Sequence, residues 1–281
     1  MIIDFHTHTF PDAIAAKTIA YLTEKGGIQP YREGTLSSLI ENMRHSGIDY
    51  SVVLPVVTNP RQEPTINRVS VENNGKNHVF FAGGIHPDSP DVEGTLDAIK
   101  AGGLFGVKLH PDYQGVHFDD PRYLRIMREA AKRDLYIVTH AGWDVAYRDH
   151  VHCTPDMILH VLEELKGLIE DKLILAHLGG YDMPDEVLQK LIGKPVWMDT
   201  AAVLRLYPDK CREIILRHGA DKILFASDSP WDSQRDYVRI LKGFRLGEEA
   251  EHKIFCQNAK QILGQLAASL TQAEKRRRTG A

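Results

Sequence analysis

The stretch IIDFHTH (residues 2–8) at the start of the chain carries the pattern that predicts the fold. Its apolar residues predict a short buried strand, and the strand ends in two histidines, His6 and His8. Since side chains two positions apart on a strand point to the same face, both imidazoles can reach one metal ion. The alternative is that both are simply polar residues where a strand emerges from the core.

Similar apolar, β-branched runs recur along the chain. The predicted strands are residues 2–5, 51–54, 79–83, 106–109, 135–139, 172–176, 195–198 and 222–226. Helix-start signals lie between them, at Pro11-Asp12, Thr35-Leu36, Asp91, Asp120-Pro121, Thr154-Pro155, Met183-Pro184 and Tyr207-Pro208. Because parallel strands need crossover helices, this alternation predicts a (β/α)8 TIM barrel. A doubly wound open sheet is the main alternative.

Length and charge restrict the organisation of the chain. The 281 residues suit one barrel, which commonly needs about 250 residues. We predict a single domain over residues 1–270 and a basic, frayed tail over 271–281, where EKRRR (274–278) has no apolar neighbours. A net charge of −4 gives no broad basic field, so no nucleic-acid partner is expected, although the tail leaves such a contact open.

The cysteines and the first residues indicate the compartment. Cys153, Cys211 and Cys256 are odd in number and widely spaced, and they form neither a disulfide framework nor a Cys-x-x-Cys metal pair. The chain does not begin with a basic segment followed by the apolar stretch of a secretory signal, and no apolar run approaches about 18 residues. We therefore expect a cytoplasmic protein without membrane contact; a homo-oligomer is left open.

Three further polar residues stand directly after predicted strands. His140 follows residues 135–139, His177 follows residues 172–176, and Asp228 closely follows residues 222–226. In a barrel these strand ends converge at one face, where active sites of this fold form. Any one of these histidines alone could be a buried residue satisfied by backbone groups. Together with His6 and His8 they predict one shared site.

These motifs resemble those of a known family. The stretch DFHTH (4–8), the histidines that end the fifth and sixth strands, SDSPW (227–231) and IFCQNAKQILG (254–264) are similar to the amidohydrolase superfamily. The resemblance is to its amidohydrolase-related branch, which includes aminocarboxymuconate semialdehyde decarboxylase, and it runs from residue 2 to about residue 264.

The resemblance implies a role for each of these residues. His6, His8, His140 and Asp228 would bind a divalent metal, and His177 and Asp228 would be catalytic. Three imidazoles and one carboxylate suit zinc with a coordination position left for water, while manganese, iron and nickel stay open. Zinc lowers the pKa of bound water to about 7. Asp228 would then take up its proton, and His177 would polarise a substrate carbonyl.

The fourth predicted strand adds two candidate substrate-binding residues, Lys108 and His110, which share a face by the same period of two. A lysine that points into a barrel mouth has three interpretations: an anchor for an anionic substrate, a carbamylated lysine that bridges two metals, or a structural ion pair. We favour the anchor.

A third candidate for substrate binding is His86, shortly after the third predicted strand. The segment GGIHP (83–87) resembles a feature of TatD-type nucleases in the same superfamily. Those nucleases usually place a metal-binding glutamate on strand four, where this chain has Lys108. A phosphodiesterase is therefore a weak hypothesis, and a structural role for His86 is the alternative to substrate contact.

Three functions follow as hypotheses. The first is hydrolysis of an amide, ester or lactone of a small anionic substrate by metal-activated water. The second is non-oxidative decarboxylation or hydration of a small carboxylated compound on the same metal site. The third is a non-catalytic barrel that keeps a metal for structure or serves as a binding partner, which predicts a closed coordination shell.

Overall fold

A computed structural model describes residues 1–264, so the predicted tail (271–281) and the last residues of the predicted domain lie outside the described residues. The strands are β1 (Ile3–Thr7), β2 (Tyr50–Val53), β3 (Val79–Phe81), β4 (Gly83–Gly84), β5 (Gly106–Leu109), β6 (Tyr136–Thr139), β7 (Leu173–Leu175), β8 (Trp197–Asp199) and β9 (Ile223–Leu224). All neighbouring strands pair in parallel. β3 and β4 are two parts of one barrel strand, so the eight predicted strands are confirmed.

The two ends of the sheet meet, which excludes the open-sheet alternative. The backbone N–H of Phe5 donates to Phe225 O at 2.9 Å, and the N–H of His8 donates to Ser229 O at 2.7 Å. On the other side of the ring, Ala82 N between β3 and β4 donates to Val53 O at 3.0 Å. These bonds close the (β/α)8 barrel across the places where regular strand pairing is interrupted.

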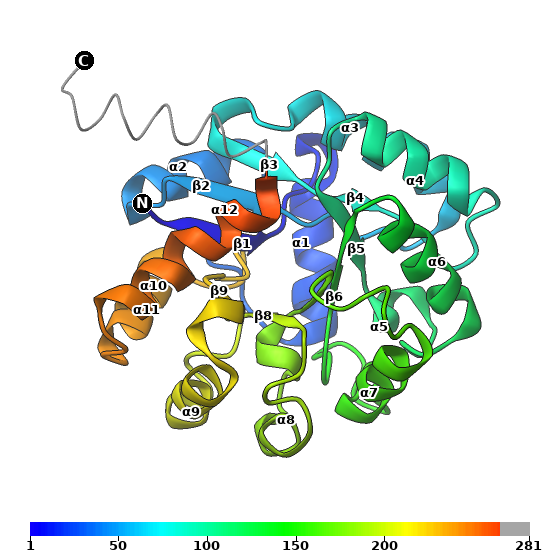
Figure 1. Cartoon of the computed structure of the whole chain (residues 1–281). Helices are drawn as coiled ribbons and strands as arrows, with labels where there is room; N and C mark the ends of the chain where they lie inside the picture. Colours follow the sequence, from blue (N-terminus) through cyan, green and yellow to red (C-terminus); the bar gives the residue numbers. More distant parts are fainter. Residues whose placement is uncertain (265–281) are drawn as a thin grey trace.

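Helices surround the strands (Figure 1). They are α1 (Asp12–Gly26), α2 (Leu36–Ser46), α3 (Glu63–Asn73), α4 (Val92–Ala101), α5 (Pro111–Gln114), α6 (Pro121–Lys132), α7 (Pro155–Glu164), α8 (Pro184–Lys190), α9 (Pro208–His218), α10 (Gln234–Gly243), α11 (Glu248–His252) and α12 (Asn258–Leu263). The seven predicted helix starts are confirmed. At α2, for example, the Thr35 hydroxyl accepts a hydrogen bond from Ser38 N at 3.1 Å, which satisfies a free N–H of the first turn.

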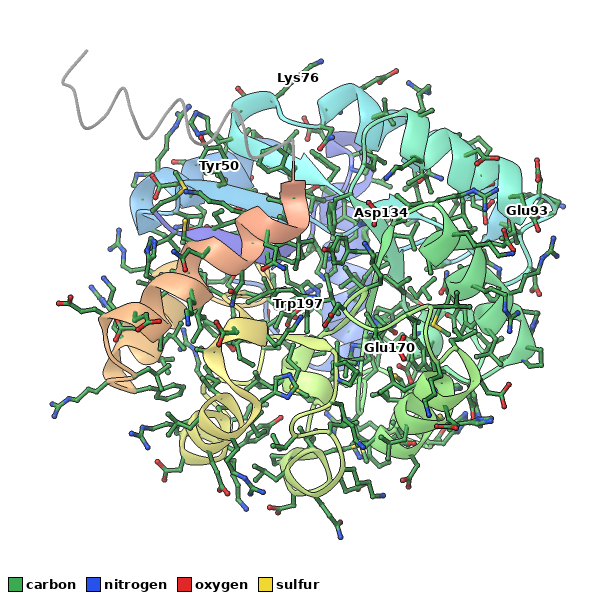
Figure 2. All side chains as sticks on the ribbon, viewed as in Figure 1. Tyr50, Lys76, Glu93, Asp134, Glu170 and Trp197 are labelled. Atoms are coloured by element: carbon green, nitrogen blue, oxygen red, sulfur yellow. The ribbon has the colours of Figure 1, made fainter. Side chains whose placement is uncertain are left out.

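The core has an inner and an outer layer, as the strand period of two requires. On β6, Val138 belongs to the apolar cluster inside the barrel, whereas Ile137 packs outward against the helices. Ile262 of α12 joins the inner cluster and helps to close the end opposite the strand C-termini. Figure 2 shows Trp197 near the centre, while charged side chains such as Glu93 lie at the periphery. The barrel is therefore filled, and an active site has to lie at its mouth.

Helix α1 is an addition to the alternating pattern, because it lies between β1 and α2. In Figure 1 it crosses behind the strands, over the barrel opening. Ile14 and Tyr21 of this helix are 50% and 57% exposed, although both are large and apolar. Both line the cavity described below, so α1 forms an apolar wall of the mouth.

Candidate active site

A cavity of about 930 Å³ opens at the end of the barrel where the strands reach their C-termini. Every residue predicted for the site lines this cavity except His86: His6, His8, Lys108, His110, His140, His177 and Asp228. The fold thus brings together groups from opposite ends of the sequence.

Three of these residues form a compact group, His6, His8 and Asp228, which we call the first ligand group. The Nε2 atoms of His6 and His8 lie 3.1 Å apart. Asp228 Oδ1 lies 3.4 Å from His6 Nε2 and 3.3 Å from His8 Nε2. Atoms bound at about 2.1 Å to one tetrahedral ion lie about 3.4 Å from one another, so these separations match a shared ion.

The proton positions in this group follow from the partners behind the rings. His8 Nδ1 lies 2.9 Å from the carbonyl oxygen of Leu54, which can only accept, so His8 Nδ1 donates. His6 Nδ1 lies 2.8 Å from Asp199 Oδ2 and donates to that carboxylate. In the neutral imidazoles both Nε2 atoms therefore carry a lone pair and no hydrogen. Two lone pairs and a carboxylate oxygen facing one another repel, and a cation between them removes that repulsion.

Electrostatics keep these groups in the forms that bind metal. Burial lowers the pKa of His6 well below its ordinary value, so the ring is neutral at pH 7. Burial alone would raise the pKa of Asp228, but the neighbouring imidazoles of His6 and His8 lower it below its usual range. A divalent cation therefore fits the first ligand group, with neutral imidazoles and an ionised carboxylate as donors.

His140 and His177 lie beside this group but contact each other. His177 Nε2 is 3.0 Å from His140 Nδ1, and His177 Nδ1 donates to Ala201 O at 2.9 Å. His177 Nε2 must then accept from His140 Nδ1. Yet His140 Nε2 also faces an acceptor, Trp143 O, at 3.1 Å. A neutral His140 has one N–H and can satisfy only one of these two contacts.

His140 also belongs to a second ligand group, together with His110 and Asp144. The rings of His110 and His140 are stacked with centroids 4.5 Å apart. His110 Nε2 lies 3.7 Å from Asp144 Oδ2, beyond hydrogen-bond distance, and His110 Nδ1 has no hydrogen-bond partner among the described residues. Burial raises the pKa of Asp144 to about 6. This group is looser than the first and its carboxylate is less stabilised as an anion.

Comparison with known proteins decides the family. The amidohydrolase family model matches residues 3–265, which is nearly the whole chain. This chain belongs to the amidohydrolase family. The resemblance noted from the sequence motifs is thereby confirmed, and the chain is a metal-dependent enzyme of the amidohydrolase superfamily.

Solved structures show the same fold at low sequence identity. The 2,6-dihydroxybenzoate decarboxylase from Rhizobium is 16% identical, with a TM-score of 0.69 over 93% of this chain and 98% of that chain. A probable 2-pyrone-4,6-dicarboxylic acid hydrolase from Acinetobacter baumannii is 17% identical, with a TM-score of 0.67 over 94% and 99%. The 5-carboxyvanillate decarboxylase from Sphingomonas paucimobilis is 13% identical, with a TM-score of 0.65 over 93% and 98%. This amidohydrolase is thus similar in fold to enzymes of two reaction types.

No curated protein gives a significant match to the sequence. Among the described residues of this amidohydrolase, no helix combines the length and the apolar character needed to cross a membrane.

Lys108 lines the amidohydrolase cavity and is only 1% exposed. Within residues 1–264 no carboxylate forms an ion pair with its ammonium group at 4.0 Å or less, which does not support the structural ion pair considered above. Burial lowers the pKa of Lys108 to about 8, an effect that the charges of Asp199 and Asp228 oppose. A charged group held in a cavity without a partner is suited to bind an anionic part of a ligand.

His86 lies elsewhere than the other predicted residues. It does not line the cavity, and its Nδ1 accepts a hydrogen bond from Asp88 N at 3.1 Å. Its own backbone N–H donates to Glu63 Oε1 at 2.7 Å, which ties this turn to α3. This geometry favours the structural alternative for His86.

Asp199 is a site residue that the sequence interpretation missed. Besides His6 Nδ1, it accepts the backbone N–H of His177 at 3.0 Å, so one buried carboxylate orients both histidines. Burial raises its pKa, and the charges of His177 and Lys108 oppose this. Asp199 is the last residue of β8, so the same strand-end argument that identified His140 could have found it.

Proposed function

We propose that this amidohydrolase uses a divalent metal, most simply zinc, to hydrolyse an amide, ester or lactone bond in a small carboxylated substrate. The observation that carries the proposal is that the first ligand group shares its cavity with the Lys108 ammonium group, which has no carboxylate partner among the described residues. Three hydrogen-free donor atoms, of His6, His8 and Asp228, and the side chain of Lys108 share one cavity.

The residues present define how the ion would be held. His6, His8 and Asp228 supply the three converging donors, and the family resemblance adds His140 as the fourth. His140 currently shares a hydrogen with His177, so it would exchange that contact for the ion. When bound, a divalent ion supplies Lewis-acid polarisation and makes water acidic enough to attack near neutral pH.

Asp228 and His177 would move the protons. Asp228 is an anion at neutral pH, so its carboxylate can accept a proton from the attacking water and return it to the leaving group. The hydrogen bond to Ala201 O fixes the His177 tautomer with a lone pair on Nε2. Neutral His177 is therefore an acceptor, and it would polarise a substrate carbonyl only after taking up a proton at Nε2.

The remaining cavity wall suits a carboxylated ring compound. Lys108 and Arg61 among the lining residues can bind carboxylate groups, whereas Trp143 and Trp231 offer flat apolar surfaces. The similar solved structures carry names that contain benzoate, carboxyvanillate and pyrone dicarboxylic acid. These names support the same substrate class for this chain.

The second candidate is non-oxidative decarboxylation or hydration of such a compound. It is favoured by the same placement of Lys108. A carboxylate bound there, close to a Lewis acid, can either position the substrate or be the group that leaves as carbon dioxide. Two of the solved structures reported above are named decarboxylases. The ligand set is common to both candidates.

Product analysis separates the two candidates. The zinc-loaded protein is incubated with a panel of lactones, esters, amides and carboxylated aromatic compounds, and products are identified by mass. We expect addition of one water with incorporation of ¹⁸O from labelled water. Release of carbon dioxide without water addition would reject hydrolysis and support decarboxylation. If no compound reacted with the zinc-loaded protein, the non-catalytic barrel would be the better account.

A further inference from the structure

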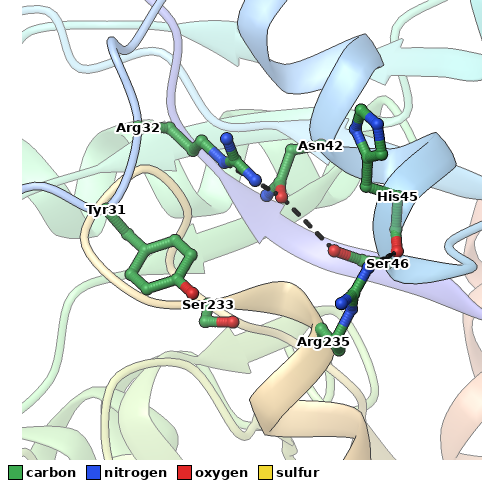
Figure 3. Close-up of a pocket in the computed structure, with 7 residues that line it drawn as sticks. All are labelled: Tyr31, Arg32, Asn42, His45, Ser46, Ser233 and Arg235. Atoms are coloured by element: carbon green, nitrogen blue, oxygen red, sulfur yellow. Dashed lines mark hydrogen bonds between the residues drawn. The ribbon is translucent and has the colours of Figure 1, made fainter.

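A second cavity lies on the outside of the barrel, between α2, the N-terminus of α10 and the connection from α1 to α2 (Figure 3). It measures about 320 Å³, which is at the lower end of small-molecule sites. The side chains around it are Tyr31, Arg32, Asn42, His45, Ser46, Ser233 and Arg235, none of which lines the barrel mouth. This outer pocket has no role in the proposed reaction.

Among the described residues that line the outer pocket there are two guanidinium groups and no carboxylate. Arg32 is held by the hydrogen bond from its Nε to Asn42 Oδ1 at 3.2 Å, and Arg235 Nη2 donates to the carbonyl oxygen of His45. Neither arginine forms an ion pair with a carboxylate in the described part of the chain. Each guanidinium has five N–H donors in a planar fork that matches carboxylate and phosphate oxygens, so most of these donors are free to bind an anion.

Asn42 adds a buried donor without a partner. Its side chain is part of the pocket lining and the residue is 1% exposed. Its Oδ1 accepts from Arg32 Nε and from Ser46 Oγ, at 3.2 and 3.3 Å. Its Nδ2 has no hydrogen-bond partner within residues 1–264. A buried amide donor left unsatisfied is costly, and an anion oxygen in the pocket would satisfy it.

The backbone around the pocket is also fixed and polarised for an anion. Tyr31 N and Arg32 N both donate to the carbonyl oxygen of Pro230, at 2.6 and 3.3 Å, which holds the connecting segment in place. Ser233 caps the ten-residue helix α10, whose N-terminus contributes partial positive charge at the pocket.

We propose that the outer pocket binds a phosphate group, as inorganic phosphate or as the phosphate of a small monoester. Arg32 and Arg235 supply the charge and bidentate donors, Asn42 Nδ2 supplies the buried donor, and Ser233 at the start of α10 completes the pocket. The cavity has room for a phosphate with a small organic substituent. No residue that lines this pocket is among those that line the barrel mouth.

The proposal is tested by titrating the full chain with inorganic phosphate in chloride buffer. Binding is measured by calorimetry and by the change in melting temperature. We expect saturable binding of one phosphate per chain with Kd at or below about 1 mM, and a melting temperature that rises to a plateau. The variant N42D keeps the shape and the acceptor for Arg32 and Ser46, but replaces the free donor by a negative charge. We expect it to bind phosphate at least about tenfold more weakly.

A pair of arginine variants controls for general charge effects. R235Q should also weaken phosphate binding about tenfold or more, whereas R239Q, on the same helix but outside the pocket, should leave Kd within about twofold. Because Arg235 is exposed, R235Q tests the site even if N42D fails to fold. Binding that does not saturate, equal loss in R239Q, or unchanged affinity in folded N42D and R235Q would overturn the proposal.

Discussion

The two ligand groups at the barrel mouth contain the same residue types but differ in preorganisation. In the first group, each imidazole is oriented from behind by an acceptor, Asp199 or Leu54 O, and the free nitrogens face each other. In the second group, His140 divides its single N–H between two acceptors, and His110 Nδ1 has no hydrogen-bond partner in the described part of the chain. Ligand type alone therefore does not make a metal site; the partners behind the ligands aim the lone pairs.

The pKa values of the two carboxylates also differ, and again the first group is better prepared to bind a metal. Asp228 is stabilised as an anion by His8 and His6 despite its burial, whereas burial raises the pKa of Asp144 to about 6. A metal ligand has to be deprotonated to bind. The comparison therefore supports our proposal that the first group holds the ion, with His140 joining it from the second group, and it leaves His110 and Asp144 to face substrate.

The largest effect is expected from a matched pair of carboxylate variants. D228N should lower metal affinity by more than about 100-fold, because it removes a donor atom that binds the ion directly. That factor is the upper end for changes to residues that only support a metal ligand. D144N, an identical change in the second group, should keep full metal occupancy. Metal equivalents per chain, measured by mass spectrometry after dialysis, check both. Loss of metal in D144N with retention in D228N would reverse the assignment of the groups.

The next effect separates metal binding from proton transfer. His177→Ala should keep the metal and reduce kcat by about 10²- to 10⁴-fold, since a positioned acid–base group is removed while the first ligand group stays intact. The check is the same metal analysis combined with steady-state kinetics. If the variant lost its metal as well, His177 would be a metal ligand and would belong with the first ligand group.

The sequence predicted the fold and most of this site because both depend on short-range patterns. The eight apolar runs and the capped helix starts are local signals, and a closed barrel follows from their alternation. His6, His8 and Asp228 could be identified because residues at strand C-termini must converge.

The division into two groups could not be predicted, since it depends on loop conformation. His177 has a positive φ of 59°, which sets the direction of its side chain toward His140. Asp144 lies in the loop after β6, where no periodic pattern fixes its position. His86, which we predicted shortly after the third strand, does not line the cavity: that strand ends at Gly84, and the backbone N–H of His86 donates to Glu63.

A smaller effect is expected from the residue behind the first group. D199N should weaken metal binding about 10- to 100-fold, the usual range for a changed partner of a metal-binding histidine, because His6 loses its orienting acceptor. Asp112 offers the matched control on the other side, where it accepts from His152 Nδ1 at 2.8 Å. Asp112 Oδ2 lies 3.8 Å from Nε2 of His140 but supports neither histidine of the first group, so D112N should weaken metal binding less than D199N does. Equal losses in both variants would show that general destabilisation, and not orientation of His6, determines affinity.

The smallest effect concerns Lys108, which lines the same cavity as both groups and is the proposed carboxylate anchor. Burial lowers its pKa from 10.5 to about 8, so the side chain is charged below pH 8 and neutral above it. For carboxylated substrates kcat/KM should therefore fall about tenfold per pH unit above pH 8, because the anchor loses its charge. K108R, whose guanidinium stays protonated, should remove this decline. A neutral ester of the same substrate should not show it in the wild type; if it did, the decline would belong to the metal site, and Lys108 would have no role as an anchor.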